Sequence, residues 1–433
     1  LPTFYQDFDA RRRGDKDYKS ATRDVAKLIG ELKKQNVDGV LVDLRNNGGG
    51  SLSEATDLTG LFIGKGPVVQ VRSANGRIEE EQNADIGMAW SGPLAVLINR
   101  NSASASEIFA AAIQDYGRGL IIGEPSYGKG TVQNLVDLDQ VKGNEKPSYG
   151  ELKMTIAQFF RVNGGSTQLR GVTPDISFPL TIDFDQNGEQ AFDNALPWTS
   201  IAAAGYTPSA NLAAVVPMLE ARHEQRVAQE KEWQALQADI ADFRKLRKDT
   251  TISLNEQVRR AERDEQEKKK HERHPELAAA NATTGSKNAL DAASNQKGED
   301  SNTQRKELAN GASATPPKSA AQNRADADQP EATARFTDVH KPKVDTTTTK
   351  DAASDNAADP ARDEGIQDDG LQADERSLKT DLAAERKRKI EKDVVLNEVA
   401  HILADEVTLI RADNKLAARV LPHTALNNKD IVD

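Results

Sequence analysis

Apolar and polar residues alternate along the first 180 residues as they do in α/β proteins. Short apolar runs at Gly39–Leu44, Pro93–Ile98 and Gly119–Gly123 have the length of buried strands. Apolar residues recur every three or four positions in Ser20–Gln35 and Ser104–Tyr116, which predicts helices there. The other patterned segments predict a helix that buries Ala55, Leu58, Leu61 and Phe62, and strands at Val68–Arg72, Thr131–Leu138 and Leu152–Val162. Short strands and helices joined by Gly-rich turns predict an α/β fold.

The pattern changes after about residue 180. Asn211–Phe243 is helical in pattern and rich in charge, and we expect an interruption at Pro217. Glu256–Glu272 is a dense run of Arg, Glu and Lys, which predicts a helix exposed to solvent. We therefore expect a core at residues 1–180 and a helical extension at residues 181–275.

Residues 276–377 hold almost nothing that a core could bury. They consist largely of Ala, Asp, Thr, Asn, Gln and Lys. Burial of so little apolar surface cannot offset the backbone entropy lost on folding, so we predict disorder. Residues 378–433 regain an apolar stripe from Val395 to Ile410, which predicts an amphipathic helix that must pack on something.

Composition excludes several kinds of function. The 433 residues contain 57 Lys and Arg against 68 Asp and Glu, giving a net charge of −11, which argues against nucleic acid as the main partner. The absence of Cys excludes disulfides, thiolate nucleophiles and zinc sites with sulfur ligands. No apolar run reaches the roughly 18 to 20 residues of a membrane-spanning helix.

Three Ser residues alternate with Ala between Asn101 and Glu107, directly after a predicted strand. One interpretation is purely structural, because Ser104 and Glu107 have the spacing of a helix capping box. The other is chemical. A Ser at a strand-to-helix junction presents its hydroxyl where the helix dipole and free N–H groups stabilise negative charge.

A nucleophilic Ser needs a base, and all six His residues lie after residue 222. A Lys base is simpler than a His from the helical or disordered half. Lys129 lies between Gly128 and Gly130 in a turn flanked by predicted strands. Burial would lower its pKa and let it accept a proton, whereas an exposed turn Lys would have no such role.

Phosphate binding is an alternative function for the same turn. Gly123, Gly128 and Lys129 match the G-x-x-x-x-G-K pattern of a phosphate-binding loop. The next residue should be Ser or Thr, but it is Gly130, and the segment that follows alternates like a strand instead of opening a helix. These two departures argue against a nucleotide site.

A second Gly-rich segment, Asn46–Ser51, follows a predicted strand and opens a predicted helix. Gly48, Gly49 and Gly50 either form a permissive turn or present a nest of N–H groups to an anion. Beside a Ser nucleophile, such a nest is a candidate oxyanion hole.

Together these segments resemble the carboxy-terminal processing, or tail-specific, proteases, and most closely their long periplasmic branch. The resemblance rests on four ordered motifs, Val42–Gly50 (VDLRNNGGG), Asn101–Glu107 (NSASASE), Gly123–Gln133 (GEPSYGKGTVQ) and Gly171–Asp175 (GVTPD). It extends thinly through Asn194–Trp198 into the C-terminal helices. It implies a crotonase/ClpP-like protease core with a helical extension. The family's N-terminal region and PDZ domain have no counterpart here, so we expect a fragment.

The resemblance also implies roles for single residues. Ser104 matches the family's nucleophile, Lys129 its general base and Gln133 a Gln that orients this Lys. In an extended strand Gln133 would share the face of Lys129. Asp115 matches an important Asp, but it lies about three helical turns beyond Ser104, so we expect a supporting role. Backbone N–H groups of Gly48–Gly50 and Ala105 would form the oxyanion hole.

The implied function is a serine endopeptidase that needs neither cofactor nor metal. It would form an acyl-enzyme and cleave periplasmic proteins marked by apolar, unstructured C-terminal tails, with adaptor or envelope proteins as partners. A second hypothesis is a non-catalytic scaffold that binds a partner. A third is a crotonase-type acyl-CoA enzyme, which would leave the Ser and Lys motifs unexplained.

Overall fold

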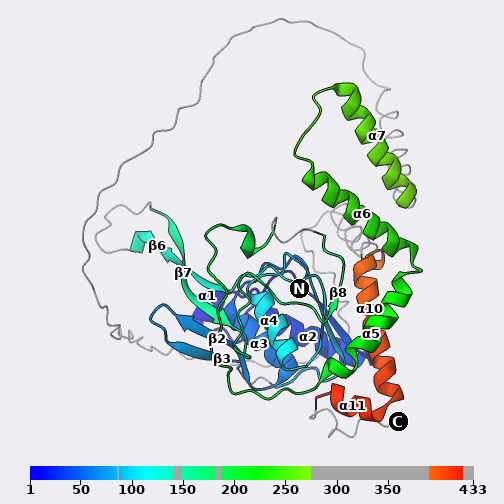
Figure 1. The fold of residues 1–433 in the computed structure, drawn as a ribbon. Helices are drawn as coiled ribbons and strands as arrows, with labels where there is room; N and C mark the ends of the chain where they lie inside the picture. The colour runs from blue at the N-terminus through cyan, green and yellow to red at the C-terminus, as the bar shows by residue number, and fades with distance from the viewer. Residues whose placement is uncertain (85–86, 141–148, 182–186, 275–389, 423–433) are drawn as a thin grey trace, which may run out of the picture. The chain divides into compact units, whose positions relative to one another are not determined.

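The computed structural model describes residues 1–84, 87–140, 149–181, 187–274 and 390–422, and within them the strands form two four-stranded sheets (Figure 1). The first sheet is parallel, in the order β1 (Val40–Asp43), β4 (Leu94–Ile98), β5 (Leu120–Gly123), β8 (Ile176–Ser177). The second is antiparallel, in the order β3 (Ile78–Gln82), β2 (Pro67–Ser73), β7 (Glu151–Phe160), β6 (Thr131–Asp137). The predicted α/β fold is confirmed.

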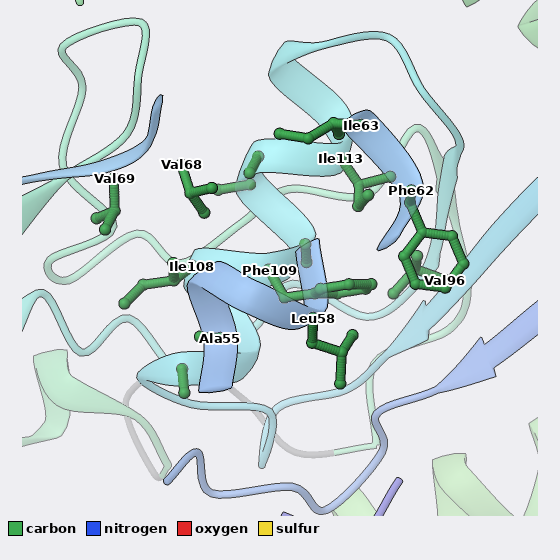
Figure 2. Close-up of a cluster of buried hydrophobic side chains, with 14 of the residues drawn as sticks. Ala55, Leu58, Phe62, Ile63, Val68, Val69, Val96, Ile108, Phe109 and Ile113 are labelled. Carbon is green, nitrogen blue, oxygen red and sulfur yellow. The ribbon is translucent and has the colours of Figure 1, made fainter. Parts of the chain in front are cut away.

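One face of the parallel sheet packs against α3 (Leu52–Ile63) and α4 (Ala105–Asp115). Successive side chains of a strand point to opposite faces, so Val96 and Ile98 of β4 join this cluster. Figure 2 shows Phe109 in the middle of this cluster and Phe62 to its right. Their rings are 5.7 Å apart and nearly perpendicular, an arrangement that aromatic pairs favour. Helices α1 (Phe8–Arg13) and α2 (Ala21–Lys34) complete this side of the chain's N-terminal part.

The opposite face of the parallel sheet is covered by helices from the C-terminal half. They are α5 (Val216–Val227), α6 (Lys231–Lys248), α10 (Val394–Ala412) and α11 (Asn414–Val420). Leu97 and Ile122 of the sheet share a buried cluster with Trp233 of α6 and with Val399 and Ile402 of α10. The predicted apolar stripe of the last helix therefore packs on the sheet that carries the motifs.

Several sequence predictions need correction. Pro217 does not interrupt the helical segment, because it lies in the first turn of α5, where a missing N–H costs nothing. The break falls instead between α5 and α6. Strand β3 was missed because its residues are largely exposed and Glu-rich, so they show no apolar alternation. The charged helix α7 (Glu256–Arg273) buries no residue, as expected. The segment predicted to be disordered, 276–377, lies outside the described residues.

Three short 3-10 turns complete the described elements: η1 (Leu138–Gln140), η2 (Glu189–Ala191) and η3 (Leu212–Ala214). Within the described ranges, no helix has both the length and the hydropathy needed to cross a membrane.

Helix α10 brings a carboxyl group, Glu406, into the core. Its side chain is buried, and burial raises its pKa to about 8 against the attraction of Arg118. Arg118 is itself buried and donates to the carbonyl oxygens of Phe62 and Trp90. Because the pKa of Glu406 is higher in the folded chain than in the unfolded one, its contribution to stability is complete below about pH 4.5 and is lost as pH rises through about 8.

We therefore predict that the chain loses thermal stability between pH 5 and pH 8.5, and that Glu406→Gln weakens this pH dependence. The Gln side chain cannot ionise, so the part of the slope caused by Glu406 disappears. Melting temperatures of both proteins at the two pH values provide the measurement. Equal pH slopes in the wild type and the variant would contradict the assignment.

Candidate active site

Ser104 lies at the N-terminal end of α4, at the end of a sharp turn that begins where β4 ends. Its φ of 57° and ψ of −113° fall in a region that non-Gly residues rarely adopt. Such strain costs on the order of 1 to 3 kcal/mol and persists only where neighbouring contacts enforce it. Two contacts do so here. Ala103 N donates to Asn47 O at 3.0 Å, and Ser104 N donates to Glu107 Oε2 at 2.7 Å.

The three alternating Ser residues have different surroundings. Ser102 and Ser106 are fully buried, and their hydroxyl groups donate to the carbonyl oxygens of Leu44 and Asn47, each at 2.8 Å. Ser104 is partly exposed. Of the three, the middle Ser is thus the one whose hydroxyl a substrate can reach, while its neighbours fix the turn to the β1 loop.

The Gly-rich loop after β1 packs directly on Ser104. A Cβ atom added to Gly49 would lie 2.8 Å from Ala103 O and 2.9 Å from Ser104 Cβ, and the φ of Gly49 is +107°. Only Gly fits this close approach. Two motifs that are far apart in the sequence, Val42–Gly50 and Asn101–Glu107, therefore meet at the carboxyl edge of the parallel sheet.

The predicted oxyanion donors, the backbone N–H groups of Gly48–Gly50 and Ala105, differ in their hydrogen bonds. Gly49 N donates to Asn47 Oδ1 at 2.9 Å, so an oxyanion bound by this N–H would have to replace that hydrogen bond, and the role of Gly49 stays a prediction. Gly48 and Gly50 are exposed. Among the described residues, no group accepts a hydrogen bond from the N–H of Gly48, Gly50 or Ala105. These three N–H groups remain available to an anion.

Lys129 belongs to the turn between β5 and β6 and is half-buried. Its Nζ donates to Gln133 Oε1 at 2.9 Å, so the predicted contact between these two side chains is present. Burial is the main cause that lowers the pKa of Lys129, and the nearby positive charge of Lys153 lowers it further. Glu189 and Glu107 act in the opposite direction. The lowered pKa is what a Lys needs to accept a proton.

The sequence named Glu107 only as the partner of Ser104 in a helix capping box. The contact from Ser104 N to Glu107 is present, but the sequence interpretation missed that Glu107 also joins the two motifs. Its carboxylate is fully buried and accepts four hydrogen bonds. Oε1 accepts from Ser126 Oγ at 2.6 Å and Gly128 N at 2.7 Å. Oε2 accepts from Ser104 N at 2.7 Å and Lys129 N at 3.0 Å. The backbones of the candidate nucleophile and the candidate base thus meet at one oxygen atom. A Glu within the apolar face of a predicted helix was the available signal.

Glu107 also makes the site sensitive to pH. Burial raises its pKa to about 7, although all four hydrogen bonds oppose this shift. Three donors are backbone N–H groups, which cannot accept a proton, so a protonated carboxyl can donate only to Ser126 Oγ and accepts weaker hydrogen bonds from the backbone than the carboxylate does. Acidification below about pH 7 should therefore loosen the contact between Ser104 and the Lys129 turn.

We predict that Glu107→Gln lowers kcat/KM by about 100-fold, because an amide has one acceptor oxygen and its NH2 group faces at least one backbone donor in either orientation. Asp175→Asn is the matched control. Asp175 also accepts from a backbone N–H, that of Ile121 at 2.8 Å, but it does not bind the Ser104 turn. Steady-state kinetics and melting temperatures of the two variants provide the test. Equal losses of kcat/KM would contradict a positioning role for Glu107.

A buried cation, Arg100, ties the same turns together. Its guanidinium donates to the carbonyl oxygens of Ser126 and Asn187, and its charge attracts Glu107. Burial lowers the pKa of Arg100. A Cβ atom at Gly188 would collide with Arg100 Nη2, which explains why Gly is needed there.

Asp115 lies at the other end of α4 and takes no part in this network. Its buried carboxylate binds Arg161 through two hydrogen bonds, at 2.6 and 3.0 Å, and accepts from Asn163 Nδ2 at 2.8 Å. Burial raises its pKa, while Arg161 lowers it. Asp115 thus fixes α4 to the end of β7, as a supporting residue would.

We predict that Asp115→Asn lowers the free energy of unfolding by about 3 kcal/mol, because it leaves the Arg161 charge without its buried partner. Asp9→Asn is the control, since the pair of Asp9 with Arg12 is exposed and should not contribute measurably. Urea unfolding followed by circular dichroism measures both. A similar small effect in the two variants would contradict the structural role.

No hydrogen bond joins Ser104 Oγ to Lys129 Nζ within the described part of the chain. The structure brings their backbones to one carboxylate, and Gln133 holds the Lys side chain. Ser104, Lys129, Gln133, Gly48 and Ala105 therefore gather around one edge of the sheet, whereas Asp115 does not.

Comparisons with known proteins show which families the two parts of the chain resemble. Residues 3–178 match the model of peptidase family S41, and residues 182–338 match the C-terminal domain of tail specific protease. The tail-specific protease of Haemophilus influenzae is 46% identical over 250 residues, which cover 57% of this chain and 36% of that protein. Carboxyl-terminal-processing peptidase 2 of Arabidopsis thaliana chloroplasts is 35% identical over 178 residues, 41% of this chain and 32% of that protein.

Among solved structures, the photosystem II D1 C-terminal processing protease is 30% identical, with a TM-score of 0.34 and coverage of 43% of each chain. The chain spans about a third of the length of the two curated relatives named above.

Proposed function

Because residues 3–178 match peptidase family S41 and residues 182–338 match the C-terminal domain of tail specific protease, we propose that the chain carries the catalytic core of a serine endopeptidase of the C-terminal processing type. The observation that supports this most directly is the shared carboxylate of Glu107. It binds the backbone N–H groups of Ser104 and Lys129 and so holds a strained, accessible Ser beside a Lys of lowered pKa.

The proposed reaction has two steps. Neutral Lys129 takes the proton of Ser104 Oγ as this oxygen attacks the scissile carbonyl carbon, and the N–H groups of Gly48 and Ala105 bind the oxyanion. Lys129 then gives the proton to the leaving amine, and the acyl group stays on Ser104. Water, deprotonated by Lys129, releases the acyl group and restores Ser104. Gln133 would keep the Lys129 ammonium within reach of Ser104.

We extend the proposal to substrate and location. The substrates would be periplasmic proteins with apolar, unstructured C-terminal tails, and adaptor or envelope proteins would act as partners. The similarity to a tail-specific protease supports this extension. An unstructured tail is suited to the reaction, since an extended chain can reach the buried edge of a sheet without unfolding a domain first.

A tail-swap experiment tests the proposal. Two copies of one folded reporter protein carry unstructured tails of equal length, one ending in apolar residues and one in Asp. We expect the chain to cleave the first copy at least tenfold faster. Equal cleavage of both would reject the tail preference alone. No cleavage of either, together with no hydrolysis of a small activated ester, would favour the non-catalytic scaffold.

A further inference from the structure

Helix α10 contacts Arg45, the residue that precedes the Gly-rich loop packed on Ser104. Arg45 lies two residues after the end of β1, and its guanidinium binds two carboxylates. Nε and Nη2 donate to Asp43, with the shortest distance 2.7 Å. Nη1 and Nη2 donate to Oδ1 and Oδ2 of Asp393 at 3.1 and 2.6 Å. This second pair is bidentate, a geometry that gives both strength and direction.

Asp393 has two tasks at once. It is the N-cap of α10, where its Oδ1 accepts from Leu396 N at 3.0 Å. Its side chain is 26% exposed and that of Arg45 21%, so water screens the pair only in part. The rest of α10 is anchored by apolar contacts with the sheet, since Val399 and Ile402 are fully buried. Asp393 therefore binds Arg45 to a firmly packed helix, although the two residues are 348 positions apart in the sequence.

Few contacts separate Arg45 from Ser104 in space, because the residues that follow Arg45 pack on the Ser104 turn. Asn46 follows with a φ of 60°, and Asn47 is fully buried and accepts from Ala103 N and Ser106 Oγ through its carbonyl oxygen. Gly49 then lies against Ser104 Cβ. A shift of Arg45 would therefore move the Gly-rich loop relative to Ser104.

We propose that Asp393 is a positioning residue of the active site, which holds the Gly-rich loop against Ser104 through Arg45. This inference rests on the proposed peptidase function. It makes α10 a required part of the catalytic unit, in addition to a cover for the sheet. The N-terminal match to the peptidase family ends at residue 178, so this contribution comes from outside the matched segment.

Three variants separate the two tasks of Asp393. Asp393→Ser keeps an N-cap oxygen but is too short to reach Arg45, whereas Asp393→Asn keeps the cap and one oxygen near Arg45. Asp393→Ala loses both. If Asp393 positions the loop, we expect kcat to fall about tenfold in Asp393→Ser and less in Asp393→Asn, with KM little changed.

Asp405→Asn is the matched control on the same helix. Asp405 pairs with Arg222 at 3.0 Å and Arg226 at 2.8 Å, both on α5, so its loss removes ion pairs of α10 without touching Arg45. We expect this variant to keep the wild-type kcat. A kcat in Asp393→Ser equal to that of Asp405→Asn would overturn the inference.

A second readout does not depend on peptidase activity. Amide hydrogen exchange in the segment 44–51 should be faster in Asp393→Ser than in the wild type and unchanged in Asp405→Asn. Faster exchange in a chain that hydrolyses no substrate would support the anchor and reject the proposed function. Unchanged exchange in Asp393→Ser, with normal hydrolysis, would reject the anchor and keep the function.

Discussion

Replacement of Ser104 by Ala should lower the rate of substrate cleavage by about 10⁴-fold or more and leave the fold intact. In the proposed reaction this change removes the atom that would form the bond to the substrate acyl group, and in serine hydrolases loss of the nucleophile has effects of this size. Cleavage of the apolar-tailed reporter and the melting temperature of the variant are the measurements. A variant that retains a tenth of the wild-type activity would contradict the assignment of Ser104.

The neighbouring Ser residues provide controls. Ser106→Ala removes the hydrogen bond to Asn47 O. Ser102→Ala removes the one to Leu44 O and also the one that Ser102 Oγ accepts from Asn99 N at 3.0 Å. Each lost bond costs about 1 kcal/mol of stability, but neither hydroxyl is exposed to a substrate. Both variants should keep most of the activity of the folded protein.

The backbone of Ser104 adds a further control. Its φ of 57° suits Gly better than Ser, so Ser104→Gly should be inactive and yet melt at a higher temperature than the wild type. Strain that is kept at the cost of stability is expected where an exposed nucleophile must be presented.

Replacement of Lys129 by Ala should lower kcat/KM by about 10³-fold, near the upper part of the range for loss of a general base. Lys129→Arg tests whether the loss of activity comes from the missing base or from the missing positive charge. Arg keeps the positive charge but does not give up its proton in proteins, so it should be as inactive as Ala if Lys129 acts as a base. Recovery of activity in the Arg variant would indicate that the charge alone matters.

The pH profile gives an independent view of the same residue. Because burial lowers the pKa of Lys129, the neutral form is reached at a lower pH than for a free Lys, and kcat/KM should rise with pH through that pKa. Gln133→Glu places a negative charge where Gln133 Oε1 now accepts from Lys129 Nζ. It should shift the rise toward higher pH, since a nearby carboxylate stabilises the ammonium. An unshifted profile would separate Lys129 from the proton transfer.

The sequence predicted most of the fold because its signals are local. The buried strands Leu94–Ile98 and Leu120–Gly123 are short apolar runs, and α4 begins and ends near Ser104 and Gly117, the residues that its pattern indicated. Strand β3 was not predicted, because an exposed strand needs no apolar alternation. The interruption expected at Pro217 was wrong, because Pro breaks the interior of a helix but fits its first turn.

The site was predictable only in part, for a physical reason. Ser104, Lys129 and Gln133 stand in recognisable motifs, but the groups that bring them together act across the fold. Glu107 bonds to a turn more than 20 residues away, and Arg45 binds a helix that is 348 residues distant. Such contacts depend on tertiary packing, and neither spacing nor composition reveals them. The hydrogen bond from Gly49 N to Asn47 Oδ1 was not predicted either, although the two residues are only two positions apart.

The scaffold hypothesis and the peptidase hypothesis differ in what they require of this network. A scaffold has no need for a strained, accessible Ser beside a Lys whose pKa is lowered by burial. Strain of this kind is found where function demands it. The arrangement therefore favours the peptidase, and the covalent intermediate is the place where the two hypotheses can be separated.

Trapping that intermediate tests the Ser104–Lys129 pair most directly. The chain is mixed with an activated acyl ester, the reaction is stopped with acid within seconds, and the modified residue is located by peptide mass spectrometry. We expect the acyl group on Ser104, with its formation slowed at least 100-fold in Lys129→Ala. An acyl group on another residue, or equal labelling of Ser104→Ala and the wild type, would contradict the account.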